Sequence, residues 1–317
     1  MVYSPFWGSH WATVGFKYLS QTVKTLVLLF RWRPSVVFVM TPPVVACFAV
    51  WFYAKLAGAK YVIDAHSAAL MSKRWTRVLF LHRFASRRAV STIVTNRHLK
   101  DLVESWGGHA TIVTDVPVEF SVPEGVDLGE GCNMTLVSSF AYDEPIETFF
   151  EAARQLPGVR FHVTGDYRKK LVASVLKKKP ENVHLTGFLS DSRYVGLLRE
   201  SDAVIALTTR DHTMQRGAYE AIYLGKPVIT SDFPLLREVF CQGAVHVDPS
   251  VDGLVRGIEE MRANLADYTA QAEQLRDRKI EAWEGVADNL RRLTGLEAPQ
   301  RAVENTEGVY SQGRVQG

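Results

Sequence analysis

Cysteine is scarce in this 317-residue sequence, and its spacing excludes the usual cysteine sites. Cys47, Cys132 and Cys241 are odd in number and lie far apart. No two of them have the short spacing of a zinc-ligand pair or a redox pair, and structural disulfides belong mainly to secreted proteins. We therefore expect a reduced, cytoplasmic compartment.

A signal peptide and an uninterrupted hydrophobic span are also lacking. Met1 is followed by Val-Tyr-Ser-Pro-Phe-Trp, without a basic start or a clean apolar run. The uncharged segment 35–54 has about the ~20 residues that a membrane span requires, but Pro42 and Pro43 lie at its centre and break a helix there. A buried strand over Val36–Met40, a turn, and a helix over Val44–Leu56 are predicted instead.

Acidic residues are absent between positions 73 and 100, where eight cations gather: Lys73, Arg74, Arg77, Arg83, Arg87, Arg88, Arg97 and Lys100. Such a segment suits phosphates on nucleic acid, lipid or an anionic substrate, and it equally suits a solvated helix face. It contains no recognised nucleic-acid-binding module, so nucleic acid is not the expected partner.

Aromatic residues near the start raise the question of a membrane surface. They are Phe6, Trp7, Trp11, Phe16 and Tyr18. Together with the basic segment they lead to the hypothesis of peripheral contact with an anionic membrane at its cytoplasmic face. They could equally line a core or an acceptor cleft.

Strands and helices alternate regularly in the second half. The strand patterns are Met134–Val137, Val159–Thr164, Val183–Thr186, Ala203–Leu207, Pro227–Thr230 and Ala244–Val247. Amphipathic stretches of helical length separate them, which is typical of βαβ crossovers and a parallel sheet covered on both faces.

The first part repeats this alternation less completely. Its strand patterns are Val36–Met40, Tyr61–Asp64, Thr92–Thr95 and Thr111–Val113, with a first helix over Thr22–Phe30. We predict an α/β protein of two Rossmann-like, doubly wound parallel-sheet domains facing a cleft. Residues 1–120 form the first domain, 121–133 a turn-rich linker, 134–266 the second domain, 267–296 helices that return to the first domain, and 297–317 a disordered tail.

The segment 210–232 carries the clearest signs of chemistry. A polar loop after a buried strand leads into a helix that begins near Gly217 and ends at Gly225. The helix start offers free N–H groups and a positive dipole end, to which Arg216 adds a full charge. Gly217 would let a ligand approach the backbone. A diphosphate at this helix start, with a ribose diol on the Glu220 carboxylate one turn later, is a coherent way to hold a nucleotide sugar.

With these residues the sequence resembles the group 1 glycosyltransferases of the family 4-like GT-B superfamily. Their pattern is Glu, seven residues, Glu-Ala, then Gly-x-Pro-Val and a small residue, which Glu220-Ala221, Gly225–Val228 and Thr230-Ser231 match. The segments 163–166, 182–188 and 201–204 follow in the family's order. The resemblance covers about residues 134–265, and the order of several weak motifs is more specific than any one of them.

The resemblance implies a donor site and its residues. Gly165 and Asp166 end a strand at the nucleotide site, Gly187 and Phe188 belong to the base-binding loop, and Ala218 opens the donor helix. His66 ends a strand that points a histidine at the donor sugar, although a histidine there can also cap a turn.

The resemblance also implies the chemistry, which is retaining transfer from a nucleoside-diphosphate sugar to a lipid-linked or glycan acceptor. Backbone N–H groups and Arg216 would stabilise the charge that develops on the departing diphosphate. No metal or further cofactor is required, and the sequence has no Asp-x-Asp.

The family pattern fails in three places. His212 replaces the first Glu, and Asp211 or His212 would take over its contacts. Ser138-Ser139 stand where the family has a basic pair, leaving Arg168 as a candidate phosphate ligand or a solvated helix start. The first strand of the family is not recognisable, so we expect the reading frame to continue upstream. These losses support a second hypothesis, a binding or regulatory protein without catalysis; a nucleotide-sugar epimerase is the third.

Overall fold

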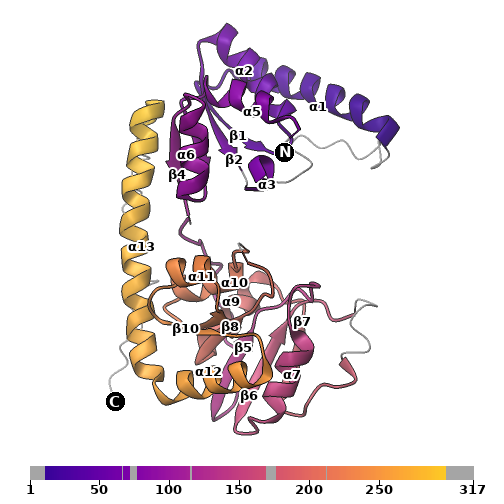
Figure 1. Cartoon of the computed structure of the whole chain (residues 1–317), viewed down its shortest axis with the longest axis vertical. Helices are drawn as coiled ribbons and strands as arrows, with labels where there is room; N and C mark the ends of the chain where they lie inside the picture. The colour runs from indigo at the N-terminus through magenta and orange to yellow at the C-terminus, as the bar shows by residue number, and fades with distance from the viewer. Residues whose placement is uncertain are drawn as a thin grey trace. The chain divides into compact units, whose positions relative to one another are not determined.

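The computed structural model describes residues 11–65, 67–71, 77–114, 116–168, 176–211 and 213–297. By its contacts the chain divides into two compact units. Unit 1 comprises residues 1–114 and 283–317, and unit 2 comprises residues 115–282. Each unit is described by itself below, with the element labels of Figure 1.

Unit 1 is built on a parallel sheet of four described strands. In spatial order they are β1 (Val36–Thr41), β2 (Lys60–Ala65), β3 (Ser91–Val94) and β4 (Ala110–Ile112). The helices are α1 (Trp11–Trp32), α2 (Val45–Ala57), α3 (Ser67–Met71), α5 (Leu79–Ser86) and α6 (Arg97–Ser105). Among the described residues β1 pairs with β2 alone, so it forms one edge of the sheet.

Pro42 and Pro43 separate β1 from α2, as the sequence indicates. Helix α2 then packs its buried side on the sheet through Cys47, Val50 and Tyr53. Helix α1 is longer than the predicted Thr22–Phe30. Nothing in its sequence interrupts it before Arg33, which has a positive φ of 47° and precedes Pro34.

Unit 2 is built on a parallel sheet of six described strands. In spatial order they are β10 (Ala244–Val247), β9 (Val228–Ser231), β8 (Ala203–Ala206), β5 (Cys132–Leu136), β6 (Val159–Thr164) and β7 (Val183–Gly187). Its helices include α7 (Ile146–Arg154), α9 (Asp191–Glu200), α10 (Arg216–Tyr223), α11 (Pro234–Val239) and α12 (Val251–Ala263). The strand order reverses between β5 and β8, and ligands of such sheets bind at this switch point.

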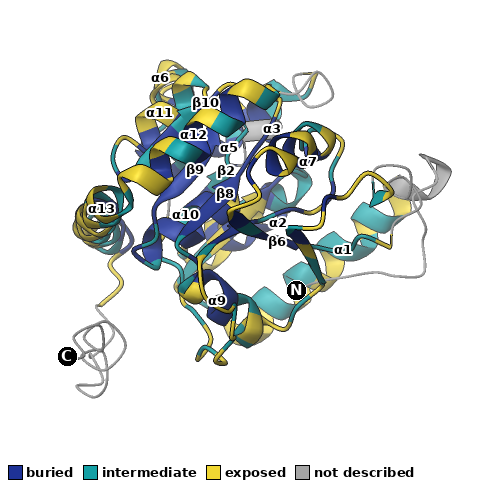
Figure 2. Cartoon of the chain, turned by 90° about the horizontal axis from the view of Figure 1, so that it is seen from below, coloured by how far each residue is buried: buried dark blue, intermediate teal, exposed yellow. Residues whose placement is uncertain are grey.

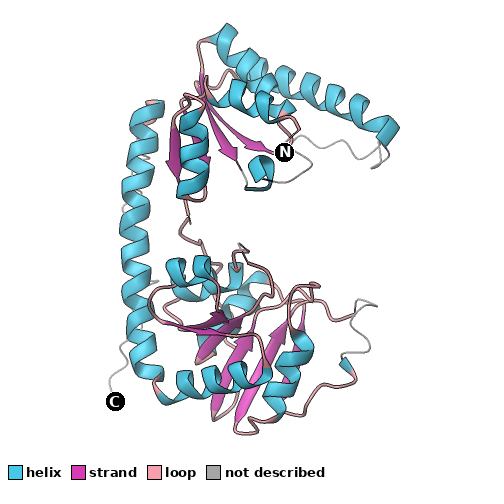
Figure 3. Ribbon diagram, viewed as in Figure 1, coloured by secondary structure: helices cyan, strands magenta, loops and turns pink. Residues whose placement is uncertain are grey.

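The central strands of unit 2 are buried on both faces. Every residue of β8 and of β9 is buried, and Figure 2 shows these strands among the dark blue interior. Helices lie against the strands in the ribbon of Figure 3. A parallel sheet covered on both faces explains why the strand sequences are nearly continuous hydrophobic runs.

The turn-rich segment predicted as a linker, 121–133, has no helix or strand over residues 121–131, and β5 begins within it at Cys132. Part of it lies against α9, because the Glu124 N–H donates to the Ser192 carbonyl over 3.1 Å. A Cβ added at Gly196 would meet the Glu124 carbonyl oxygen at 1.9 Å. The glycine in α9 is therefore what lets this segment approach the helix.

A single helix, α13 (Leu265–Thr294), follows α12. Ala272 and Leu275 are buried in its first half, which belongs to unit 2, while Leu290 and Thr294 are buried in the half that belongs to unit 1. No proline interrupts its 30 residues. In the described part of the chain no helix has both the length and the apolar character to cross a membrane.

Two buried histidines make the stability of the fold depend on pH. Burial lowers the pKa of His82 and of His162 from 6.5 to about 4, and His184 and Arg160 add to the effect at His162. The unfolded chain therefore binds protons between these values that the folded chain does not. We expect the free energy of unfolding to fall as the pH falls, by about 1 kcal/mol per imidazole between about pH 7 and about pH 5.5.

Urea unfolding at the two pH values measures this effect. His162→Gln should flatten the pH dependence, whereas His98→Gln, at an exposed position, should leave it unchanged. A pH dependence that is the same in His162→Gln and in the wild type would contradict the assignment.

Candidate functional site

The predicted donor-binding residues of unit 2 follow four neighbouring strands. The segments after β8, β5, β6 and β7 begin at Leu207, Val137, Gly165 and Phe188 respectively. Because all four strands are parallel, these segments lie along one edge of the sheet. Three strand spacings of about 4.8 Å each make this row about 14 Å wide. The edge includes the switch point between β5 and β8.

The start of α10 packs against the end of β5. A Cβ added at Gly217 would lie 2.7 Å from Cβ and Cγ1 of Val137. The prediction that Gly217 lets a ligand approach the backbone is not tested by this contact, but Val137 occupies the space that a side chain at this position would need. The glycine is required because helix and strand approach closely, and the neighbouring Ala218 is fully buried. Arg216, in contrast, has a side chain that is 87% exposed.

Glu220 is held at the switch point by two donors. The Tyr194 hydroxyl on α9 donates to Oε2 over 2.5 Å, and Arg216 Nε donates to Oε1 over 2.8 Å. Glu220 is only 8% exposed. A carboxylate has about four lone-pair positions, so two hydrogen bonds fix its orientation and leave acceptor capacity for a ligand.

The same contacts shift the titration of the two donors. Burial and the negative charge of Glu220 raise the pKa of Tyr194, so its hydroxyl stays protonated and donates. The hydrogen bond to Glu220 raises the pKa of Arg216. Tyr194 was not foreseen from the sequence, because its link to Glu220 depends on how α9 packs beside α10.

The loop after β5 contains a second carboxylate that the sequence did not single out. Glu144 accepts hydrogen bonds from the N–H groups of Ser139 and Ala141, at 3.1 Å and 3.3 Å. It also accepts from the hydroxyls of Ser138 and Ser139. Phe140, with a positive φ of 55°, lets the loop turn around this carboxylate. An acidic side chain thus occupies N–H donors in the loop where the family has its basic pair.

The loops after β5 and β8 are tied together across the switch point. Thr208 Oγ1 donates to Asp143 Oδ2 over 3.0 Å, and the Thr209 N–H donates to the Asp143 carbonyl over 2.7 Å. Arg210 donates to the Tyr142 hydroxyl over 2.6 Å. These bonds hold the first residues after β8, from Thr208 to Arg210, against the loop after β5.

The loops after β6 and β7 also meet. The Gly165 N–H donates to the Gly187 carbonyl over 3.1 Å, and both glycines have positive φ angles. Arg168 pairs with Asp166, Nε to Oδ1 at 2.8 Å, so its guanidinium is engaged within its own loop. Phe188 is 83% exposed, which is compatible with the predicted role of stacking on a base.

Two predicted site residues, His66 and His212, lie outside the described residues. Asp211 is exposed in the loop before α10, and its carbonyl accepts from the Thr213 hydroxyl over 3.4 Å. Among the described residues no group of three or more His, Cys, Asp or Glu side chains is placed to hold a metal ion.

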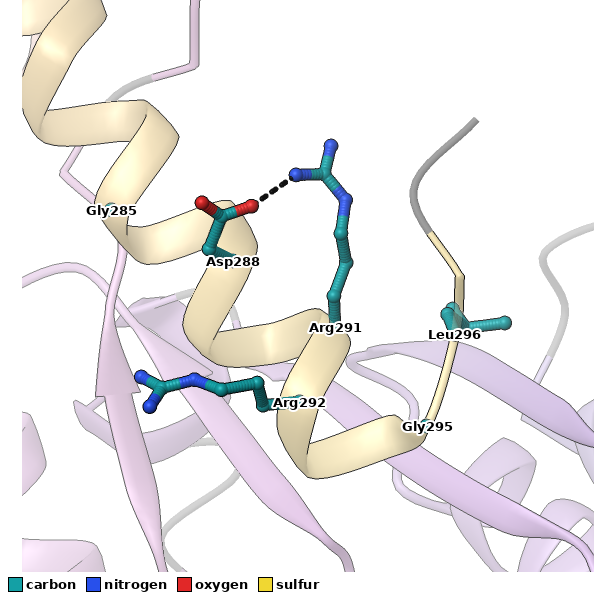
Figure 4. A pocket seen from close by; sticks show the side chains of 6 residues that line it. All are labelled: Gly285, Asp288, Arg291, Arg292, Gly295 and Leu296. Atoms are coloured by element: carbon teal, nitrogen blue, oxygen red, sulfur yellow. Dashed lines mark hydrogen bonds and ion pairs between the residues drawn. The ribbon is translucent and has the colours of Figure 1, made fainter. Parts of the chain in front are cut away.

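Unit 1 has a shallow hollow of its own. It has a volume of about 680 Å³ and lies beside the end of α13, lined by Gly285, Asp288, Arg291, Arg292, Gly295 and Leu296. Figure 4 shows Arg291 paired with Asp288 and Arg292 directed to the other side of the helix. Because these cations do not converge, the hollow does not form an anion site.

The Tyr194–Glu220 hydrogen bond should contribute measurably to stability. We expect Tyr194→Phe to lower the free energy of unfolding by about 1.5 kcal/mol, since a hydrogen bond to a charged, partly buried group is lost. Tyr268 provides a matched control, because its hydroxyl donates to Glu260 over the same 2.5 Å at an exposed position. Tyr268→Phe should change the free energy by less than about 0.5 kcal/mol. Equal losses in the two variants, measured by urea unfolding, would contradict this prediction.

A comparison with models of protein families finds a match within unit 2. Residues 133–278 match the family model described as glycosyl transferases group 1. The resemblance found in the sequence is thereby confirmed, since this part of the chain is similar to the group 1 glycosyl transferases. A comparison with curated protein sequences found no match.

Solved structures share the fold at low sequence identity. The sucrose-phosphate synthase of Thermosynechococcus elongatus matches with a TM-score of 0.64 at 16% identity, covering 88% of this chain and 78% of its own. Anabaena Alr3699/HepE, in complex with UDP and glucose, matches with a TM-score of 0.63 at 15% sequence identity. This match covers 90% of this chain and 84% of that one. A putative UDP-N-acetylglucosamine 2-epimerase from Listeria monocytogenes matches with a TM-score of 0.62 at 14% sequence identity. This match covers 89% of this chain and 81% of that one.

The fold class is therefore α/β of the GT-B type, with two Rossmann-like units on parallel sheets. The family match and this fold together support glycosyl transfer as the class of function.

Proposed function

We propose that this protein transfers a sugar from a nucleoside-diphosphate sugar to a lipid-linked or polysaccharide acceptor, with retention of configuration and without a metal ion. The observation that carries the proposal is the Glu220 carboxylate, held by Tyr194 and Arg216 beside the switch point of the sheet. This arrangement supplies a fixed acceptor for hydroxyl groups next to an exposed cation.

A nucleotide sugar would extend along the row of strand ends. The base would lie at Gly187 and Phe188, the ribose diol on Glu220, and the diphosphate at the start of α10. Support comes from Alr3699/HepE, whose structures hold UDP, UDP with glucose, and UDP-glucose. The N–H groups of the first turn of α10 and the guanidinium of Arg216 would face the diphosphate.

Catalysis would follow from charge development on the leaving diphosphate. Arg216 uses Nε on Glu220, and its remaining N–H groups are on an exposed side chain. A preorganised cation stabilises the charged transition state more than the ground state. Arg168 binds Asp166 through both Nε and Nη2, whereas Arg216 binds Glu220 through Nε and stands at the start of α10, so Arg216 is the stronger candidate for this role. His66 and His212 lie outside the described residues, so their proposed contacts with the transferred sugar, and that of Asp211, stay predictions.

One observation favours a second candidate function, that of a protein which binds the donor without turnover. Glu144 places a negative charge in the loop where the family has cations. A diphosphate would meet repulsion there unless Glu144 moved away. An epimerase remains the third candidate, and the Listeria structure supports it only through the fold.

Calorimetry with UDP- and GDP-sugars, followed by product analysis, separates these candidates. Donor binding, acceptor-dependent release of the nucleoside diphosphate and a retained anomeric configuration in the product would support the proposal. Binding without turnover over a broad acceptor panel would favour the binding protein, and an acceptor-independent change of the sugar would favour the epimerase. Absence of binding to every nucleotide sugar would refute all three.

A further inference from the structure

The loop of residues 137–145 joins β5 to α7 and borders the start of α10, where the diphosphate is proposed to lie. Val137, at its beginning, is the residue that a Cβ added at Gly217 would meet. Further along the loop, Glu144 lines one small void together with Val137 and with Leu207, the first residue after β8. Glu144 is therefore placed beside the ends of β5 and β8, at the switch point of the sheet.

Four neutral donors hold the carboxylate of Glu144. The Ser138 hydroxyl donates to Oε2 over 2.5 Å, and the Ser139 hydroxyl donates to Oε1 over 2.9 Å. The N–H groups of Ser139 and Ala141 donate to the same carboxylate over 3.1 Å and 3.3 Å. Neutral donors orient a carboxylate and stabilise its charged form, but they leave its negative charge in place.

The loop around Glu144 is anchored on both sides of this carboxylate. The Ser138 N–H donates to Thr164 Oγ1 on β6 over 3.2 Å. Asp143, which precedes Glu144, accepts a hydrogen bond from Thr208 Oγ1 over 3.0 Å. These anchors fix the backbone of the loop, and moving the carboxylate away would break its hydrogen bonds to four donors.

The described cations of the neighbouring loops are engaged elsewhere. Arg216 is paired with Glu220 at 2.8 Å, so these two side chains together carry no net charge. The guanidinium in the loop after β6 is likewise paired with a carboxylate of its own loop. Arg210, after β8, is exposed and donates to the Tyr142 hydroxyl, so solvent screens its charge. None of these described groups offsets the charge of Glu144.

The donor and the product of the proposed transfer differ in the charge of the terminal phosphate. In the donor this phosphate is esterified to the sugar and carries a single negative charge. After transfer it is free, and because a phosphate monoester has a second pKa of about 6, it then carries roughly two charges at neutral pH. A fixed carboxylate repels the free form more strongly, since the Coulomb energy scales with the charge of the ligand.

We propose that Glu144 is a specificity-determining residue, which makes the site favour the sugar-capped diphosphate of the donor over the free nucleoside diphosphate. This inference rests on the proposed function, because it requires a diphosphate at the start of α10. The carboxylate acts through its charge and forms no bond to the ligand. Its consequence is that the spent nucleotide leaves readily and competes only weakly with fresh donor.

Calorimetry with two forms of one nucleotide isolates the effect of charge. Uridine diphosphate and guanosine diphosphate are each compared with their β-methyl esters, which keep both phosphates, have no sugar and carry about one negative charge less. Divalent cations are removed with EDTA, so that the charge of each ligand is defined. The wild type should bind the methyl ester at least as tightly as the free diphosphate. A wild type that binds the free form more tightly would overturn the proposal.

The variant Glu144→Gln should remove or reverse this preference. Its amide oxygen can still accept from the N–H groups of the loop, while the charge is lost. The ratio of the dissociation constants, free diphosphate over methyl ester, should fall on the order of fivefold. Glu144→Asp keeps the charge and should change this ratio by less than about twofold. Glu151→Gln removes an exposed carboxylate from α7 and is the matched control, which should keep the ratio of the wild type.

The outcomes separate this inference from the proposed function. A ratio in Glu144→Gln equal to that of the wild type would overturn the inference and leave the donor site standing. An equal fall in Glu151→Gln would overturn it too, because the net charge of the unit would then explain the preference. If urea unfolding shows that Glu144→Gln does not fold, the preference of the wild type decides. Absence of binding of both nucleotides in both forms would refute the proposed function itself.

Discussion

Replacing Glu220 by alanine should weaken the binding of the donor nucleotide by about 1.5–3 kcal/mol, which is a loss of roughly 10- to 150-fold in affinity. The carboxylate is buried to 8% exposure and fixed by two donors, so it meets the ligand already oriented. Removing it takes away charge-assisted hydrogen bonds to the ribose diol, and no other carboxylate replaces them at this point of α10.

The ion-pair partner of Glu220, Arg216, makes the prediction specific. Arg216→Ala should weaken donor binding within the same range, because the diphosphate loses a cation. It should leave stability nearly unchanged, since the Arg216 side chain is 87% exposed and solvent screens its charge. The wild type should bind the nucleoside diphosphate more tightly than its 2′,3′-dideoxy analogue, which lacks the ribose hydroxyls. Glu220→Ala should remove this preference, whereas Arg216→Ala should keep it. The ratio of the two affinities therefore separates hydroxyl binding from phosphate binding.

Isothermal calorimetry with the nucleoside diphosphate measures both effects. Glu238→Ala removes an exposed carboxylate from the neighbouring helix α11 and is the matched control. It should bind the nucleotide like the wild type. If Glu220→Ala and Arg216→Ala bind with wild-type affinity as well, the donor site has been assigned to the wrong residues.

The topology of unit 2 could be predicted because each strand is a short apolar run between amphipathic segments. Strands β6 and β10 agree with their predicted bounds, Val159–Thr164 and Ala244–Val247. A strand that is buried on both faces is a short continuous apolar run, whereas a helix that is buried on one face repeats its apolar residues every three or four positions. The family match over residues 133–278 covers these same strands and helices.

The polar contacts of the site could not be predicted in this way. Tyr194 and Glu220 are 26 positions apart, and their hydrogen bond exists because α9 and α10 lie beside each other. Glu144 was noticed only as part of an unfamiliar loop. Its carboxylate accepts hydrogen bonds from backbone N–H groups, and the direction of an N–H group cannot be predicted from a sequence pattern. Gly217 was correctly placed at a helix start, but the neighbour that requires a glycine is Val137, on another strand.

The length of α1 shows a different limit. Its apolar residues were too evenly spread to reveal a buried side, and the structure explains why, since none of those described is buried. Periodicity locates a helix by the contrast between a core face and a solvent face. Where a helix carries apolar residues toward solvent, that contrast is weak and the bounds become uncertain.

Replacing Gly165 by alanine should destabilise unit 2 by about 3–5 kcal/mol, more than any other single change considered for the site. Two costs add at this position. Its φ of +102° lies in a region that residues with a Cβ rarely adopt. The added Cβ would also lie 2.2 Å from the Ser138 carbonyl oxygen, which is backbone and cannot turn away.

The same substitution at Gly285 on α13 provides the contrast. Nothing lies within 4 Å of a Cβ added there, and alanine is the better helix former by up to about 1 kcal/mol, so Gly285→Ala should stabilise slightly. Urea unfolding of both variants measures the difference, and a Gly165→Ala protein as stable as the wild type would contradict the described approach of the β5 and β6 loops. Because relief of the clash must move the Ser138 backbone, and with it the loop that surrounds Glu144, Gly165→Ala should also weaken donor binding where any folded protein is recovered. Gly165 would then be needed both for the stability of unit 2 and for the proposed donor site.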